Sequence, residues 1–148
     1  MGDLSKVLAN IPGDFCSVNM YARRHWFDSP EVAQRIQERL PSPLAIRRVL
    51  SDLRFIDYPL GGFIAPHTDG TRVDKETLQS STHTFLLYLS DAVEGEGETE
   101  FLEDLQSCKV VASVVPKAGW LLVFPHSIPH QGNCVGGSGK LLLRGDMY

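Results

Sequence analysis

From residue 45 to the end, the chain consists of short runs rich in Val, Ile, Leu, Phe and Tyr, and Gly, Pro or Asp separates one run from the next. Many short strands at near-regular spacing favour an antiparallel sandwich or barrel over alternating β-α-β units. We therefore expect a mostly β fold. The predicted strands are 45–50, 52–58, 63–67, 83–90, 98–102, 109–115, 119–124, 127–131 and 140–148.

One segment before most of these runs has the features of a helix. Ser29 can cap it, and apolar residues recur at helical spacing until Pro41 ends the pattern. The chain has 148 residues with no internal repeat and no linker-like stretch, so we expect a single domain, 1–148. Its core is predicted at about 52–148, with an N-terminal flank at 1–51.

Charge and composition argue against several partners and compartments. The net charge is −4 and no basic run stands out, so we expect no nucleic-acid partner. No stretch approaches the roughly 18 apolar residues of a membrane span, and residues 1–15 lack the apolar region of a signal peptide. The chain has three widely separated cysteines and no CxxC motif, which is typical of reduced thiols; they are Cys16, Cys108 and Cys134. We therefore expect no membrane association and a cytoplasmic location; the oligomeric state is not predicted.

The strongest chemical motif is the tripeptide His67-Thr68-Asp69. On an extended strand, positions i and i+2 project from the same face, so one imidazole and one carboxylate point into the same space. A third metal ligand would come from another strand, and His126 and His130 in FPHSIPHQG are both candidates. Two histidines and one carboxylate on one side of a metal form the triad of non-haem Fe(II) oxygenases. The alternative interpretation is a turn with a surface His–Asp pair.

The last run adds a second feature. Lys140 and Arg144 are four residues apart, so they share one face of a strand, with Leu142 between them. A cation on the inward face of a β core is costly unless an anion meets it, and a dicarboxylate co-substrate would supply that anion. The alternative interpretation is that this face is exposed to solvent.

Five blocks within 53–148 resemble, in order, the 2-oxoglutarate- and Fe(II)-dependent dioxygenases of the prolyl 4-hydroxylase-like group. They are DYPLGGFIAPHTDG, TFLLYLSD, GEGETEF, VVPKAGWLLVFPHSIPHQG and GKLLLRGDMY. The resemblance implies a double-stranded β-helix, a cupin-like jelly roll, with a flanking N-terminal helix. It also implies an enzyme that couples oxidative decarboxylation of 2-oxoglutarate, to succinate and CO2, with hydroxylation of a C–H bond. Fe(II), 2-oxoglutarate and O2 would be required, with ascorbate in support, and the substrate would be a small molecule or a peptide.

The resemblance also implies roles for the candidate metal ligands. His67, Asp69 and His130 would hold the iron and form the catalytic centre. His130 is preferred to His126 because the family's distal histidine follows Pro or Leu and precedes a small turn residue. His126 would then lie at the rim of the site or behind the ligands.

Four further residues would bind the co-substrate. Lys140 matches the basic residue that pairs with the distal carboxylate of 2-oxoglutarate, and Tyr88 matches a tyrosine that meets the same carboxylate. Tyr58 matches a tyrosine on the iron side of the pocket. Arg144 is a second candidate for the distal carboxylate because arginine binds carboxylates in a bidentate manner.

Three further expectations concern the surroundings of the site. Segment 70–82 is long and polar enough to form a lid, and segment 18–25 could form the substrate entrance. Arg54 shares a strand face with Tyr58 and could reach the cleft. Two other functions remain open: a cupin-like metal-binding module or isomerase that does not use 2-oxoglutarate, and a non-enzymatic jelly-roll domain with a vestigial site.

Overall fold

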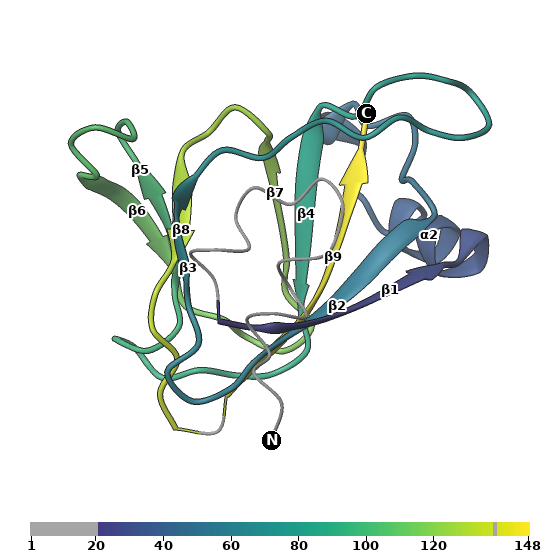
Figure 1. Ribbon diagram of the computed structural model, residues 1–148. Helices are drawn as coiled ribbons and strands as arrows, with labels where there is room; N and C mark the ends of the chain where they lie inside the picture. Colours follow the sequence, from purple (N-terminus) through teal and green to yellow (C-terminus); the bar gives the residue numbers. More distant parts are fainter. Residues whose placement is uncertain (1–20, 138) are drawn as a thin grey trace.

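The structure is a computed structural model that describes residues 21–137 and 139–148. Its strands form two antiparallel sheets that face each other (Figure 1). The larger sheet has the order β1-β2-β9-β4-β7 and the smaller one β3-β8-β5-β6. The strands are β1 (Arg23–Asp28), β2 (Asp52–Tyr58), β3 (Ile64–His67), β4 (His83–Tyr88), β5 (Thr99–Leu102), β6 (Val110–Val114), β7 (Leu121–Pro125), β8 (His130–Gly132) and β9 (Lys140–Met147). The predicted mostly β, jelly-roll architecture is confirmed.

The strands β2 to β9 each overlap one predicted run. The prediction of a strand at 45–50 is wrong. A short 3-10 helix, η2 (Ser42–Leu44), precedes it, and Ala45 then has a left-handed backbone with φ of 51°. The segment follows the end of β9 instead of joining a ladder, because the N–H groups of Arg47 and Arg48 both donate to the Tyr148 carbonyl. Its one bridge pairs Val49 with Met147.

Strand β1 was not expected from the sequence. It pairs with β2 along its whole length, from Arg23 opposite Asp57 to Asp28 opposite Asp52. The flank at 1–51 therefore contributes an edge strand to the larger sheet. Of the predicted entrance segment 18–25, residues 18–20 lie outside the described range, as do residues 1–15 and Cys16.

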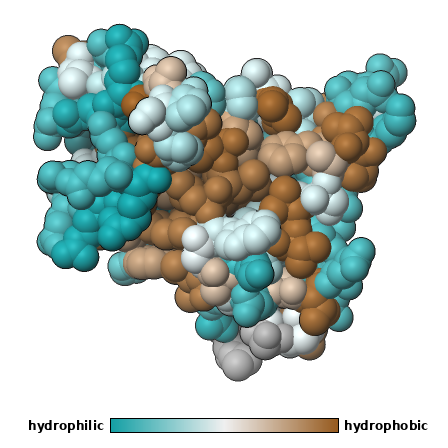
Figure 2. All heavy atoms as spheres, turned by 180° about the vertical axis from the view of Figure 1, so that it is seen from behind, coloured by the Kyte–Doolittle hydropathy of each residue, from teal (hydrophilic) through white to brown (hydrophobic). Residues whose placement is uncertain are grey.

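The helix α2 (Pro30–Gln37) confirms the prediction of a helical flank, although it ends before Pro41. Its first turn is capped by the Ser29 hydroxyl, which accepts the Val32 N–H at 3.3 Å. The helix packs on the outer face of the larger sheet, where the residues in contact are Ala33, Ile36, Val49, Leu53, Phe85, Leu143 and Met147. Seen from behind, hydrophobic side chains gather in the middle of the molecule, with hydrophilic regions on either side (Figure 2). No helix in the described ranges is both long and apolar enough to cross a membrane.

Strand β9 lies at the centre of the larger sheet, between β2 and β4. Its side chains alternate as the sequence predicts: Lys140, Leu142 and Arg144 line a pocket between the sheets, whereas Leu143 and Met147 pack under α2. Burial of a second apolar cluster on the inner face holds the two sheets together. Its members are Ala22, Ile56, Tyr58, Leu86, Tyr88, Phe124, Val135 and Leu142. The interpretation of the Lys140 face as a solvent-exposed surface is therefore wrong.

Candidate functional site

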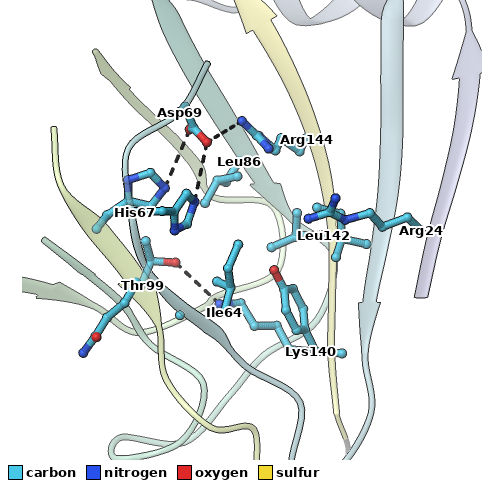
Figure 3. Close-up of a pocket in the computed structure, with 14 residues that line it drawn as sticks. Arg24, Ile64, His67, Asp69, Leu86, Thr99, Lys140, Leu142 and Arg144 are labelled. Atoms are coloured by element: carbon cyan, nitrogen blue, oxygen red, sulfur yellow. Dashed lines mark hydrogen bonds and ion pairs between the residues drawn. The ribbon is translucent and has the colours of Figure 1, made fainter. Parts of the chain in front are cut away.

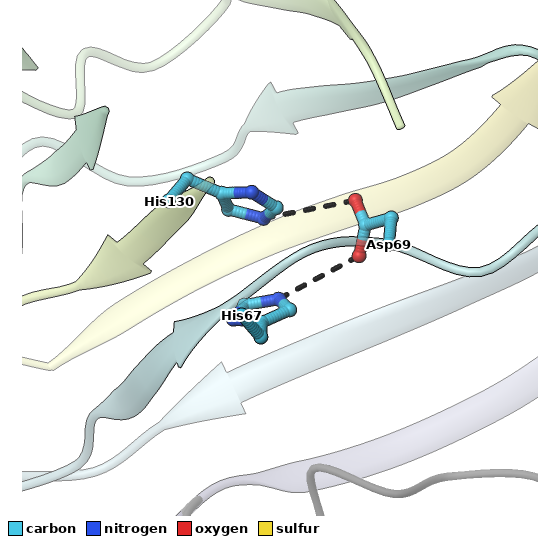
Figure 4. Close-up of side chains that lie close together, drawn as sticks. All are labelled: His67, Asp69 and His130. Atoms are coloured by element: carbon cyan, nitrogen blue, oxygen red, sulfur yellow. Dashed lines mark ion pairs between the residues drawn. The ribbon is translucent and has the colours of Figure 1, made fainter. Parts of the chain in front are cut away.

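The structure brings His67, Asp69 and His130 together between the two sheets (Figure 4). His67 ends β3 and His130 begins β8, and the two are paired across the strands. The His67 Nε2 atom lies 3.6 Å from Asp69 Oδ1, and His130 Nε2 lies 3.6 Å from Asp69 Oδ2. One potential ligand atom from each residue lies within 4.8 Å of the others. These three side chains could hold a single metal ion.

Backbone carbonyls fix which imidazole nitrogen is available to a metal. The Nδ1 atom of His67 lies 2.8 Å from the Ala65 carbonyl, and that of His130 lies 2.9 Å from the Ile128 carbonyl. A carbonyl only accepts hydrogen bonds, so each Nδ1 must carry the hydrogen. In a neutral ring the Nε2 atom then keeps its lone pair, and both Nε2 atoms face Asp69.

The electrostatics of the triad also suit a divalent cation. Burial, reinforced by the neighbouring His67, lowers the pKa of His130 to about 4, so its ring is neutral at neutral pH. Burial alone would raise the pKa of Asp69, but the Arg144 guanidinium and hydrogen bonds to the carboxylate outweigh it and hold this pKa well below the ordinary value. Two neutral imidazoles and one carboxylate are the ligand set of non-haem Fe(II) sites, so the residues fit the metal that the sequence predicts.

His126 lies behind Asp69 and outside the triad. Its backbone carbonyl accepts the Asp69 N–H at 3.0 Å. The Thr84 hydroxyl donates to Asp69 Oδ2 at 2.6 Å and therefore accepts from His126 Nδ1, which is 2.9 Å away. His126 Nε2 lies 2.7 Å from the Ser81 hydroxyl. This chain of hydrogen bonds fixes the orientation of the Asp69 carboxylate.

Arg144 lines the metal end of the pocket, whereas Arg54, which was expected to reach the cleft, does not line it. The Arg144 guanidinium lies 2.5 Å from Asp69 Oδ1, so it neutralises a candidate metal ligand. Arg54 is almost completely buried and pairs with the equally buried Asp146 at 2.8 Å. The side chain of Arg54 also lies over the Trp26 ring, 4.3 Å from its centroid.

Lys140 occupies the other end of the pocket. Its ammonium group donates to the Gly97 carbonyl at 2.7 Å and lies 3.5 Å from the Thr99 hydroxyl. The rings of Tyr58 and Tyr88 flank it, with centroids 5.5 and 5.6 Å away. Burial lowers the pKa of Lys140 to about 8. The ammonium is therefore a poorly solvated cation that an incoming carboxylate would stabilise.

A single pocket connects the triad with Lys140 (Figure 3). It is lined by Arg24, Ile56, Tyr58, Ile64, His67, Asp69, Leu86, Thr99, His130, Gln131, Gly132, Lys140, Leu142 and Arg144. Every predicted site residue lines it except Tyr88. The Tyr88 hydroxyl donates to the hydroxyl of Thr99, a residue that does line the pocket, at 2.7 Å. The sequence interpretation missed Thr99, and it included Arg24 only within the predicted entrance segment 18–25. Alternation along 98–102 was the signal that could have placed Thr99 inward.

The predicted lid and entrance segments lie largely away from this pocket. No residue of 70–82 lines it. Asp74 of that segment instead pairs with Arg48 at 2.6 Å. The Thr77 hydroxyl lies 2.7 Å from the Tyr148 hydroxyl. Among the described residues of the predicted entrance, only Arg24 reaches the pocket.

Comparison with known proteins supports the chemistry of this geometry. The 2OG-Fe(II) oxygenase superfamily matches residues 53–145. The fold is similar to that of a viral collagen prolyl hydroxylase from Paramecium Bursaria Chlorella virus-1, solved with 2OG, with a TM-score of 0.62, 20% identity and coverage of 87% of this chain and 79% of that one. It is also similar to a Pseudomonas putida prolyl-4-hydroxylase, with a TM-score of 0.60, 20% identity and coverage of 86% and 72%.

A third similar structure is an oxidoreductase of the 2OG-Fe(II) oxygenase family from Burkholderia pseudomallei. Its TM-score is 0.55 and its identity 14%, over 97% of this chain and 75% of that one. A comparison with curated protein sequences finds no match.

Proposed function

Because the chain belongs to the 2OG-Fe(II) oxygenase superfamily, we propose that His67, Asp69 and His130 bind Fe(II) and that the pocket beyond them binds 2-oxoglutarate. The protein is a 2-oxoglutarate- and Fe(II)-dependent dioxygenase. The observation that carries the residue assignment is one continuous pocket with a set of two histidines and one carboxylate at one end and the buried cation of Lys140 at the other. The cupin-like alternative without 2-oxoglutarate is not favoured by this family match.

When bound, the iron and 2-oxoglutarate supply the oxidising chemistry, in which O2 is consumed, 2-oxoglutarate is converted to succinate and CO2, and a C–H bond is hydroxylated. The protein orients the reactants and limits the access of water. We assign the distal carboxylate of 2-oxoglutarate to Lys140, with the Thr99 hydroxyl beside it. Tyr58 and Tyr88 flank this end and shield the ion pair from solvent, which strengthens it.

We assign Arg144 to Asp69 and not to 2-oxoglutarate. Its guanidinium contacts the carboxylate at 2.5 Å. Four strand residues separate the backbones of Lys140 and Arg144 by about 13 Å. Arg144 and the Thr84 hydroxyl thus position the metal-binding carboxylate, while the co-substrate is held by Lys140. Ascorbate would serve only to keep the iron reduced.

The substrate is a small molecule or a peptide. Two of the similar structures are prolyl hydroxylases, so peptidyl proline is one candidate, although their identity to this chain is only 20%. We further propose that the chain forms one catalytic domain and that it acts in the cytoplasm. Cys108 and Cys134 are exposed free thiols, as expected in a reducing compartment.

An anaerobic titration tests the metal and co-substrate assignments. Protein mixed with Fe(II) and 2-oxoglutarate should develop a visible metal-to-ligand charge-transfer band. His67→Ala should abolish the band, because one of three ligands is lost. His25→Ala, on the exposed side of β1, is the matched control and should keep it. A full band in His67→Ala, or none in the wild-type protein, would contradict the proposal.

A further inference from the structure

Residues 72–81, within the segment that was predicted to be a lid, form a narrow hairpin between β3 and β4. Near its base, Val73 bridges to Ser80. At the base itself, the Ser81 N–H donates to the Arg72 carbonyl at 2.7 Å, and the Arg72 N–H donates to the Ser81 hydroxyl at 2.8 Å. The backbone of the hairpin therefore holds the Ser81 hydroxyl in place, and the side chain is almost completely buried.

Two further buried side chains connect this hydroxyl with the metal-binding carboxylate. The Ser81 hydroxyl lies 2.7 Å from His126 Nε2, and His126 Nδ1 lies 2.9 Å from the Thr84 hydroxyl. The Thr84 hydroxyl donates to Asp69 Oδ2 at 2.6 Å. None of the three connecting residues is more than 5% exposed, so the hydrogen bonds lie in a medium where an unpaired polar atom is costly.

The two ends of this chain fix the position of every hydrogen in it. The Asp69 carboxylate only accepts hydrogen bonds, so the single Thr84 hydrogen is used there and Thr84 accepts from His126 Nδ1. In a neutral ring Nε2 then carries a lone pair and accepts the Ser81 hydrogen. The Ser81 oxygen in turn accepts the Arg72 N–H. The arrangement that orients Asp69 therefore needs the Nδ1–H tautomer of His126.

A second acceptor near the ring favours the opposite tautomer. Asp146 Oδ1 lies 4.0 Å from His126 Nε2, and this buried oxygen has no hydrogen-bond partner among the described residues. A hydrogen on Nε2 would turn toward that carboxylate, and Nδ1 would then keep the lone pair. The Thr84 hydroxyl would donate to Nδ1 and no longer to Asp69. Ser81 opposes this change because its hydrogen needs the lone pair on Nε2.

We propose that Ser81 is a positioning residue for the metal centre: it holds His126 in the Nδ1–H tautomer and thereby directs the Thr84 hydroxyl to Asp69. The inference rests on the proposed function in one respect, since it takes Asp69 as a metal ligand. The hairpin 72–81 is accordingly a support for the back of the site. Its role is to fix one hydroxyl, and no closing motion over the pocket is needed.

The tautomer is measured by 15N NMR of the imidazole rings in metal-free protein. At pH 8, above the ordinary imidazole pKa of about 6.5, the hydrogen-bearing and bare nitrogens of a neutral ring have separate 15N shifts. The His126 signals are identified by their absence from His126→Asn. We expect the hydrogen on Nδ1 in the wild-type protein and a shift toward Nε2 in Ser81→Ala. Ser80→Ala, which replaces the exposed neighbouring serine, is the matched control and should match the wild-type protein.

A double-mutant cycle connects the tautomer with metal binding. Ser81→Ala should lower the affinity for Co(II) about three- to tenfold, because a support of a metal ligand is lost. In a Thr84→Val background the same change should have less than about a twofold effect, since the connection to Asp69 is already broken. A serine that matters only for packing would instead lower the affinity by the same factor in both backgrounds.

Three results overturn the proposal: a hydrogen on His126 Nε2 in the wild-type protein, an unchanged tautomer in Ser81→Ala, or equal losses of Co(II) affinity in the two backgrounds. The combination of a shifted tautomer and a background-dependent loss supports it. The proposed function fails separately. If the wild-type protein binds no Co(II) and gives no charge-transfer band, the metal centre is wrong, and the NMR signals of the metal-free protein still decide whether Ser81 holds the tautomer.

Discussion

Replacing Lys140 with Met should stabilise the metal-free protein and weaken its binding of 2-oxoglutarate. Burial lowers the pKa of Lys140 from 10.5 to about 8, a difference that corresponds to about 3 kcal/mol against the charged form in the folded state. The variant removes this penalty but loses the hydrogen bond to the Gly97 carbonyl, which costs about 1–2 kcal/mol. We therefore expect Lys140→Met to raise the free energy of unfolding by about 1–2 kcal/mol at pH 7.

The pH dependence gives an independent check on the same reasoning. Between pH 8 and 10.5 the folded protein has released the Lys140 proton while the unfolded chain still holds it, so the unfolded state binds more protons. Stability that depends on Lys140 therefore rises with pH across this window, by about 2 kcal/mol between pH 7.5 and 10, and is lost again as pH falls through 8. The variant lacks this slope, so its stability advantage over the wild-type protein should disappear by about pH 10.

Two assays read out the change. Chemical denaturation at several pH values measures the free energy of unfolding, and the anaerobic charge-transfer band measures 2-oxoglutarate affinity, which should fall at least about tenfold in Lys140→Met. Lys117→Met replaces an exposed lysine and should change neither quantity. A variant that is less stable than the wild-type protein at pH 7 and binds 2-oxoglutarate normally would refute the assignment of Lys140.

Two further variants test how Asp69 is positioned. Thr84→Val keeps the side-chain shape but removes the hydroxyl that donates to Asp69 at 2.6 Å. We expect the affinity for Co(II) to fall about 10- to 100-fold. Thr82→Val replaces an exposed threonine and should leave the Co(II) affinity unchanged. Arg144→Gln leaves the buried Asp69 charge without its cation and should cost about 3 kcal/mol or more in metal-free protein. Because a metal ion can replace that cation, Co(II) should raise the melting temperature of Arg144→Gln more than that of the wild-type protein; an equal rise would contradict this role.

The sequence predicted the parts of the site that depend on strand periodicity. Residues two or four apart on one strand share a face, and this simple rule placed His67 on the side of Asp69 and Lys140 on the side of Arg144, so that all four line one pocket. The fold followed from the same periodicity, since the apolar runs after residue 52 alternate as half-buried strands do. The strand pattern does not show whether Lys140 or Arg144 pairs with a given carboxylate, because this depends on side chains that come from different strands. The ion pair between Arg144 and Asp69 could therefore not be predicted from the sequence.

The two errors in the strand assignment have a related cause. Strand β1 has the sequence RRHWFD, and its inward positions carry Arg24 and Trp26, so no apolar alternation marks it as a strand. Conversely, 45–50 (AIRRVL) is a short run with Ile, Val and Leu, like the true strands, but it follows a left-handed backbone at Ala45 and does not join the sheet as a strand. Polar residues on an inward face thus conceal the strand that carries them, which explains why β1 was missed although Arg24 was expected near the substrate entrance.

The inward face of β9 explains why the stability of the pocket should depend on its ligand. It carries three charged side chains, and two already have partners within the protein: Arg144 contacts Asp69, and Asp146 contacts Arg54. Lys140 instead has neutral partners, the Gly97 carbonyl and the Thr99 hydroxyl. Burial therefore lowers the pKa of Lys140, and the Coulombic attraction of Glu98 offsets this effect only in part. Binding of a dicarboxylate should supply the missing charge, so the end of the pocket that recognises 2-oxoglutarate is the end that is least stable without it.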